Sequence, residues 1–354
     1  MIFGGTAVPV LLLFYGPPLF GLAPLESAER NLILNQQHFG YENIEALCRL
    51  GRHHARAPEE IAVFGASSVE GAFATPGMDF SSVLHERLAK ASPGKWAVHN
   101  LGRSAKTSFW VKQCMKVAAQ DHARTWIVYE GHNDFADVVR AGPAKALFFL
   151  RHPEMAALAE SLLASHAGAW VRPFMRVNVD PLSWASLRRD VEAALGASEE
   201  NYREMISQAR AAGARLVFVT VVSNLDQAPD AQAVLGAPGE LDGPAAFRAA
   251  GEAFAAGHRE EALSLYKLAR DRDPRMWRAP SAFNEMLRRL AKERPGEVRL
   301  LDLEAAFEKE FAAKKKLGCE FFGSSTYCDH VHPNDFTHTW IARQLEAFLA
   351  SEGE

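Results

Sequence analysis

Three short segments of the chain carry the side chains that serine nucleophilic catalysis requires. Residues 65–71 read GASSVEG and contain Ser67, residues 131–134 read GHND and contain Asn133, and residues 329–333 read DHVHP. A hydroxyl, an amide donor and a neighbouring Asp and His supply the nucleophile, oxyanion donor, orienting acid and base of an acyl transfer. Each segment alone is also compatible with a helix cap or a turn. A catalytic role therefore requires that the fold bring the segments together at one place.

Short apolar runs precede these segments and alternate with amphipathic stretches. The predicted strands are 61–64, 96–101, 125–129, 215–222 and 298–303. The predicted helices include 81–91, 107–120, 200–212 and 336–350. This alternation predicts an α/β fold in which helices cover both faces of one parallel sheet. Ligand sites of such sheets lie at the carboxyl ends of the strands, which is where Ser67 and Asn133 fall.

In this order, the segments resemble the signature blocks of the SGNH/GDSL hydrolases. The matching blocks are Gly65-x-Ser67-x-x-x-Gly71, a second segment at 100–107, Gly131-x-Asn133-Asp134 and Asp329-x-x-His332-Pro333. The resemblance extends from residue 61 to the C-terminus. It implies a flavodoxin-like three-layer sandwich with a five-stranded parallel sheet, and the hydrolysis or transfer of an acyl group.

The resemblance also implies a role for each matching residue. Ser67 is the expected nucleophile, His332 the general base, and Asp329 the acid that orients the imidazole. The oxyanion hole is expected from the backbone amide of Ser67, the backbone amide of Ala105 and the side chain of Asn133.

Four neighbouring residues compete for these roles. Ser68 is a second hydroxyl beside the expected nucleophile, and Gly102 is an alternative amide donor for the oxyanion hole. His330 and His338 are further histidines close to the expected base, and we expect both to be polar loop or helix-surface residues.

Two positions depart from the family's pattern. Ala66 replaces the Asp of the usual Gly-Asp-Ser triplet, and Ala105 stands where the family usually has a glycine. Alanine keeps the backbone N–H that an oxyanion hole needs. Its Cβ restricts φ and ψ, however, and narrows the space beside the acyl group.

The chain divides into an N-terminal apolar arm and linker, 1–57, and an expected hydrolase domain, 58–354. Two insertions lie within that domain. Residues 136–198 form either a lid over an acyl chain or part of the core. Residues 243–293 are helical and similar in part to one tetratricopeptide-type hairpin, too few repeats for a solenoid.

Three polar residues are candidate substrate contacts: Arg278, Arg103 and Asn224. A guanidinium presents a planar fork that suits a carboxylate or a phosphate, so Arg278 could clamp an anionic substrate. The alternative for Arg278 is an ordinary structural ion pair.

The N-terminal segment and two cysteines bear on where the protein works. Residues 1–25 carry no charged side chain but contain four prolines, and predict either a membrane-associated segment or an apolar arm packed on the domain. We expect Cys319 and Cys328 to form a disulfide, which indicates an oxidising compartment. An exported or membrane-associated location follows, with the cytoplasm as the alternative.

The composition excludes several classes of partner. The 354 residues contain 39 Lys and Arg against 43 Asp and Glu without a long basic run, so no nucleic-acid partner is expected. None of the four cysteines forms a CxxC pair, and the His330/His332 pair has no evident third ligand, so we expect neither a metal nor a cofactor.

The predicted function is that of a serine esterase. Its expected substrate is a small molecule or an acylated polymer, such as a lipid or an acylated carbohydrate, cleaved through a Ser-His-Asp acyl-enzyme mechanism. An O-acyltransferase that uses the same triad is one alternative. A non-catalytic binding module on the same scaffold is the other.

Overall fold

Five short strands form one parallel sheet in the order β2-β1-β3-β4-β5. The computed structural model describes residues 44–49, 57–121, 123–136, 184–230, 241–313 and 326–351. The strands are β1 (Glu59–Gly65), β2 (Trp96–Gly102), β3 (Thr125–Tyr129), β4 (Arg215–Val219) and β5 (Val298–Leu301). All five predicted strands are confirmed, and so is the flavodoxin-like α/β class.

Two strands end earlier than the apolar runs predicted, and in each case a polar side chain bonds the backbone just beyond the strand. The amide of Asn284 both donates to the carbonyl of Val221 and accepts from its N–H, each at 2.9 Å, so the chain leaves β4 there. After β5, Asp302 accepts from the N–H of Ala305 at 3.1 Å and starts the next helix, α16 (Leu303–Ala313).

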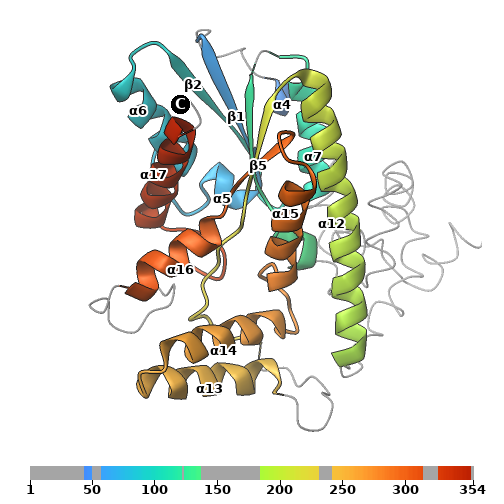
Figure 1. Ribbon diagram of the computed structural model, residues 1–354, viewed down its shortest axis with the longest axis vertical. Helices are drawn as coiled ribbons and strands as arrows, with labels where there is room; N and C mark the ends of the chain where they lie inside the picture. The colour runs from blue at the N-terminus through green and yellow to red at the C-terminus, as the bar shows by residue number, and fades with distance from the viewer. Residues whose placement is uncertain are drawn as a thin grey trace, which may run out of the picture.

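Helices cover both faces of the sheet, as Figure 1 shows. The helices α6 (Phe80–Ala91) and α17 (Asp335–Ser351) pack together on one face. The helices α7 (Ser108–Ala118), α12 (Trp184–Ala212) and α15 (Ser281–Glu293) line the other. The inner strands β1, β3 and β4 are therefore largely buried, which is why they read as nearly continuous apolar runs, whereas the edge strands β2 and β5 carry exposed positions.

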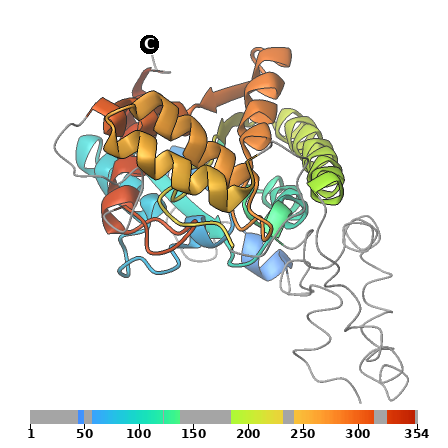
Figure 2. The same cartoon turned by 90° about the horizontal axis from the view of Figure 1, so that it is seen from below.

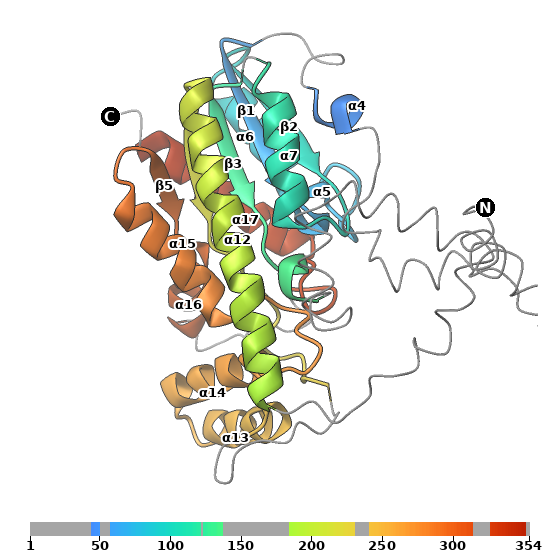
Figure 3. The same cartoon turned by 90° about the vertical axis from the view of Figure 1, so that its right-hand side faces the viewer.

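The helix α12 is far longer than the strands that it covers. Its 29 residues span roughly 43 Å at 1.5 Å per residue. It ends where β4 begins, so its first half projects past the carboxyl edge of the sheet (Figure 3). The predicted insertion 136–198 therefore ends inside this helix, and residues 137–183, where the lid was expected, lie outside the described residues.

Residues 243–293 form three helices rather than one hairpin. The helices α13 (Gly243–Ala255) and α14 (Arg259–Asp271) pack closely against each other beyond the end of the sheet, while α15 belongs to the sheet layer (Figures 1 and 2). Several small residues of the α13–α14 pair are buried: Ala246, Ala250, Ala262 and Ala269.

A buried arginine fastens this pair to the body of the protein. Arg270, 3% exposed, bonds Ser281 at 2.7 Å and pairs with Asp271 at 3.0 Å and Glu304 at 3.5 Å. Because Glu304 lies in α16 and Ser281 begins α15, one guanidinium joins α14 to two elements of the domain.

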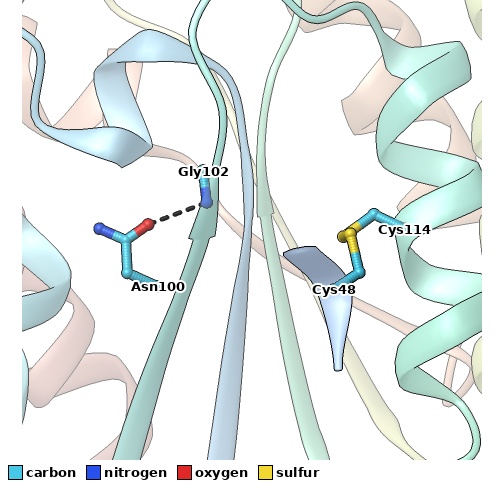
Figure 4. Close-up of a disulfide and its surroundings, with 4 residues drawn as sticks. All are labelled: Cys48, Asn100, Gly102 and Cys114. Atoms are coloured by element: carbon cyan, nitrogen blue, oxygen red, sulfur yellow. Dashed lines mark hydrogen bonds between the residues drawn. A yellow bond between two sulfur atoms is a disulfide. The ribbon is translucent and has the colours of Figure 1, made fainter. Parts of the chain in front are cut away.

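A disulfide links Cys48 of α4 (Ile44–Cys48) to Cys114 of α7 (Figure 4). Both cysteines are fully buried. The predicted bond between Cys319 and Cys328 is wrong: Cys328 is a free, exposed thiol, and Cys319 lies outside the described residues. The disulfide therefore anchors a segment that precedes the sheet rather than the loop that carries Asp329.

The apolar segment at residues 1–25 also lies outside the described residues. Among the helices that the structure describes, none is long and apolar enough to cross a membrane.

The disulfide yields a prediction about stability. Its cysteines are 66 residues apart, and closing a loop of that length contributes roughly 4 kcal/mol in the chain-entropy model. We expect the Cys48→Ala/Cys114→Ala variant to lose that much free energy of unfolding in guanidinium titrations, whereas Cys328→Ala should lose almost nothing. Peptide mapping without reductant should recover the Cys48–Cys114 cross-link, and two freely alkylated thiols at these positions would contradict the assignment.

Candidate active site

Ser67, His332 and Asp329 form one hydrogen-bonded chain at the carboxyl edge of the sheet. Ser67 is the first residue of the short helix α5 (Ser67–Glu70), directly after β1. Its Oγ lies 2.7 Å from Nε2 of His332, whose Nδ1 lies 2.6 Å from Oδ2 of Asp329. The fold thus brings together three side chains that the sequence had singled out, across a separation of 265 residues.

Asp329 is held as a carboxylate by its own loop. Burial alone would raise the pKa of this carboxyl, but the hydrogen bonds from His332 and from backbone N–H groups outweigh it and hold the pKa at about 2. Those N–H groups belong to Val331, at 2.8 Å, and His332, at 2.9 Å, and both donate to Oδ1. An ionised Asp329 keeps the proton of His332 on Nδ1, so Nε2 faces the serine as the basic nitrogen.

Two polar side chains hold this loop against the strand ends. Asn224, which follows β4, donates from its side chain to the carbonyl of Asp329 at 3.1 Å and from its backbone to the carbonyl of His330 at 2.9 Å. Ser68 donates its hydroxyl to the carbonyl of Val331 at 3.2 Å. Asn224, predicted to contact substrate, therefore positions the loop, and the hydroxyl of Ser68 is directed to a carbonyl rather than to the base.

The two competing histidines have other partners. Nδ1 of His338 accepts from the backbone N–H of Phe80 at 3.2 Å, and its ring stacks on the ring of Phe80, so it joins α17 to α6. His338 is fully buried rather than on the helix surface, and burial lowers its pKa to about 4. The ring of His330 lies against Trp277, and burial also lowers its pKa.

The expected oxyanion donors come from the two strands that flank β1. Ala105, after β2, has φ of 61°, the left-handed conformation that accounts for glycine as the usual residue there. Asn133, after β3, donates from Nδ2 to the carbonyl of Lys106 at 2.8 Å, which places its amide beside Ala105. An amide nitrogen carries two hydrogens, so this bond leaves one for an oxyanion.

Gly102, the alternative donor, is already engaged. Its N–H donates to Oδ1 of Asn100 at 2.8 Å, as Figure 4 shows. A Cβ at this position would collide with the backbone of Glu70 and Val69 in α5, so the glycine serves close packing of β2 against that helix. Ala105 therefore stays the expected amide donor of the two.

The residues beside Asn133 are fixed by buried contacts that the sequence did not suggest. Asp134 accepts from the N–H of Ser108 at 2.7 Å and from the hydroxyl of Ser198 at 2.6 Å. His132 accepts from the N–H of Ala279 at 3.0 Å, and burial lowers its pKa to about 3, so the ring is neutral. Asn133 therefore stands between two immobilised neighbours.

Glu130 is a further buried acid at the end of β3. Its backbone carbonyl accepts the hydroxyl of Tyr202 at 2.7 Å. Burial raises the pKa of its carboxyl well above the ordinary value, and the nearby charge of Asp134 raises it further. Glu130 is 3% exposed beside the site. In the sequence, only its place between the predicted strand and the GHND segment could have indicated that it lies there.

Arg278 is a structural residue, which corrects its prediction as a substrate clamp. Its side chain is 1% exposed. It pairs with Asp273 at 3.1 Å and donates to the carbonyls of Asn224 and Gln227, each at 2.8 Å. The guanidinium thus holds the loop that in turn holds Asp329. The contacts of Arg278 agree with the other expectation from the sequence, an ordinary structural ion pair.

Arg103 lies at the surface beside α5. Its side chain is 41% exposed and its Nη1 lies 3.4 Å from Oε1 of Glu70. Its backbone N–H donates to the carbonyl of Gly65 at 3.1 Å, which ties the loop after β2 to the end of β1. The role of its side chain toward substrate stays a prediction.

Comparison with known proteins identifies the family. The model of the GDSL-like lipase/acylhydrolase family matches residues 63–340, most of the chain. The chain belongs to this family. It is therefore an ester-hydrolysing enzyme, and the triad and oxyanion hole expected here are typical of its relatives.

Solved structures that match the chain are distant from it in sequence. An acetyl xylan esterase, AlAXEase, is 12% identical, with 81% of this chain and 98% of that chain covered and a TM-score of 0.44. A lipase/acylhydrolase from Enterococcus faecalis is 11% identical, with 83% and 96% covered and a TM-score of 0.42. No curated protein is significantly similar to the chain in sequence.

The geometry of Asn133 yields a kinetic prediction. An oxyanion donor acts mainly on the transition state, and its removal typically lowers kcat on the order of 10²–10³-fold. We expect Asn133→Ala to lower kcat by that factor with little change in KM. Asn201→Ala removes a buried amide that bonds Ser108 instead, so it should alter stability more than kcat. A pure KM effect for Asn133→Ala would assign the residue to substrate binding.

Proposed function

We propose that this enzyme hydrolyses carboxylic esters through a covalent acyl-enzyme formed on Ser67. The observation that carries the proposal is the continuous chain from Ser67 through His332 to Asp329, with contacts of 2.7 and 2.6 Å. A serine is a weak nucleophile unless a base accepts its proton as it attacks, and His332 is in position to do so.

Each step of the proposed reaction uses a group in this arrangement. Oγ of Ser67 attacks the ester carbonyl while Nε2 of His332 takes its proton. The negative oxygen of the tetrahedral intermediate accepts hydrogen bonds from the amides of Ser67 and Ala105 and from Asn133. His332 then gives the proton to the alcohol oxygen, the C–O bond breaks, and the alcohol leaves. Water, deprotonated by the same nitrogen, then attacks the acyl carbon. The bond from that carbon to Oγ of Ser67 breaks, His332 returns the proton to Oγ, and the carboxylic acid leaves.

The substrate class that we propose is an acylated small molecule or an acylated polymer. Transfer to a second alcohol would use the same residues, because an alcohol oxygen can replace water beside His332. Hydrolysis is the proposal that family membership supports most directly. The completeness of the hydrogen-bonded chain favours catalysis over a binding module on the same scaffold.

We also propose that the protein works in an oxidising compartment. The buried Cys48–Cys114 disulfide supports this, because such bonds persist mainly outside the cytosol.

Substitutions of the chain Ser67–His332 test the proposed function. Triad members act as a unit, so Ser67→Ala and His332→Ala should each lower kcat for an ester by roughly 10⁴–10⁶-fold, and the double variant should be little worse. His330→Ala is the matched control for the imidazole, two positions away. Ser68→Ala removes a neighbouring hydroxyl that bonds only the loop carbonyl of Val331, so it should lower kcat far less than Ser67→Ala.

Initial rates with a chromogenic ester, together with thermal unfolding of every variant, provide the measurement. Folded Ser67→Ala protein that turns over at the parent rate, or a loss confined to His330→Ala, would contradict the assignment.

A further inference from the structure

Phe73 is an exposed aromatic residue beside the proposed base. Its side chain is 71% exposed, more than the other large apolar side chains that the structure describes at the surface: Leu47, Leu241 and Phe336. Its φ of 66° is left-handed, an uncommon conformation for a bulky residue. Neither burial nor backbone preference therefore accounts for a phenyl ring at this position.

The ring of Phe73 contacts the ring of His332. Their centroids are 5.0 Å apart, with the planes at 66°, an edge-to-face contact. His332 is only partly exposed, so Phe73 forms part of the wall between the imidazole and solvent. A molecule that approaches Nε2 of His332 from this side meets the phenyl ring.

The loop that carries Phe73 is fastened on both sides. After the ring, Thr75 donates from its backbone and its hydroxyl to the carboxylate of Asp335, at 2.8 and 2.6 Å. Before it, the N–H of Ala72 donates to the carbonyl of Ser67 at 2.9 Å. Asp335 starts α17 three residues after His332. The hydrogen bonds between Thr75 and Asp335 therefore set the position of the phenyl ring relative to the base.

The chemistry of the reaction says which part of an ester lies there. His332 must deliver its proton to the oxygen of the leaving alcohol, so that oxygen lies within hydrogen-bond distance of Nε2. The carbonyl oxygen lies instead toward Ala105 and Asn133. The alcohol portion of the ester is therefore the portion next to His332, and hence next to Phe73.

We propose that Phe73 forms a subsite for the alcohol portion of the ester and favours alcohols with an apolar face, such as a sugar ring or another six-membered ring. This inference rests on the proposed function, because it uses His332 as the proton donor. A flat apolar face packs on an aromatic ring by dispersion and by exclusion of water. The subsite makes Phe73 a determinant of specificity rather than a part of the triad.

Two matched series of esters separate this subsite from the acyl side. In the first, the acyl group is always acetyl and the alcohol is methanol, cyclohexanol or methyl glucoside. In the second, the alcohol is always methanol and the acyl group is acetyl, butyryl or hexanoyl. The variants are Phe73→Ala, Phe73→Leu and Phe73→Tyr, with Phe336→Ala as the control for loss of another exposed phenyl ring.

We expect Phe73→Ala to lower kcat/KM for the cyclohexyl and glucoside acetates about tenfold relative to methyl acetate, the scale of one lost apolar contact in a pocket. The ranking of acyl groups should not change. Phe73→Tyr keeps the ring and should behave as the parent, Phe73→Leu should be intermediate, and Phe336→Ala should leave both series unchanged. Equal losses for all three alcohols, or a change confined to the acyl series, would overturn the proposal.

Labelling of Ser67 by a fluorophosphonate keeps the two proposals distinguishable. The probe expels fluoride and has no leaving alcohol, so Phe73→Ala should react at the parent rate if the triad is intact. Parent-like labelling with unchanged alcohol preference would refute the subsite alone. Failure of the parent protein to label, with Ser67→Ala fully active, would refute the proposed function instead.

Discussion

The hydrogen bond between Nε2 of His332 and Oγ of Ser67 is the contact on which the rest of the site depends. Its two residues lie 265 positions apart, one at the end of β1 and the other before α17, so local structure alone cannot hold them at 2.7 Å. The parallel sheet supplies the coarse placement, because all its strands deliver their ends to one edge. The final placement comes from hydrogen bonds between the loops at that edge.

These bonds form a connected series of polar contacts between residues. Asp273 pairs with Arg278, Arg278 binds the carbonyl of Asn224, and Asn224 binds the backbone of Asp329 and His330. A buried ion pair adds little net stability, but removal of one partner leaves the other charge uncompensated. Arg278 therefore serves to position the site. Through it, the segment that follows α14 holds Asn224, which in turn holds the loop that carries Asp329 and His332.

Much of this arrangement could be predicted from the sequence. Ser67 and Asn133 lie in short segments directly after apolar runs, and the Asp329/His332 pair lies just before the last helix, at the spacing that the family resemblance implies. The left-handed φ of Ala105 agrees with the glycine that the family usually has there. In these cases the residue types and their spacing along the chain determine the position and conformation of the site residues, and both can be read from the sequence.

The sequence-based predictions were wrong where packing between residues distant in the chain determines the partners of a side chain. Cys319 and Cys328 are close in sequence, but Cys48 and Cys114 are the pair that two packed helices, α4 and α7, bring together. Arg278 has the chemistry of an anion clamp, yet the fold surrounds it with Asp273 and two carbonyls. Phe73 gave no signal at all, because its significance lies in its contact with His332.

Trapping of the acyl-enzyme tests the central claim most directly. The parent protein would be mixed with an ester, quenched in acid within one turnover and digested for mass spectrometry. We expect a transient mass increase equal to the acyl group on the peptide that contains Ser67, with fragment ions that place it on that residue and not on Ser68. Ester turnover with no acylated peptide, or with the acyl group on another residue, would contradict it.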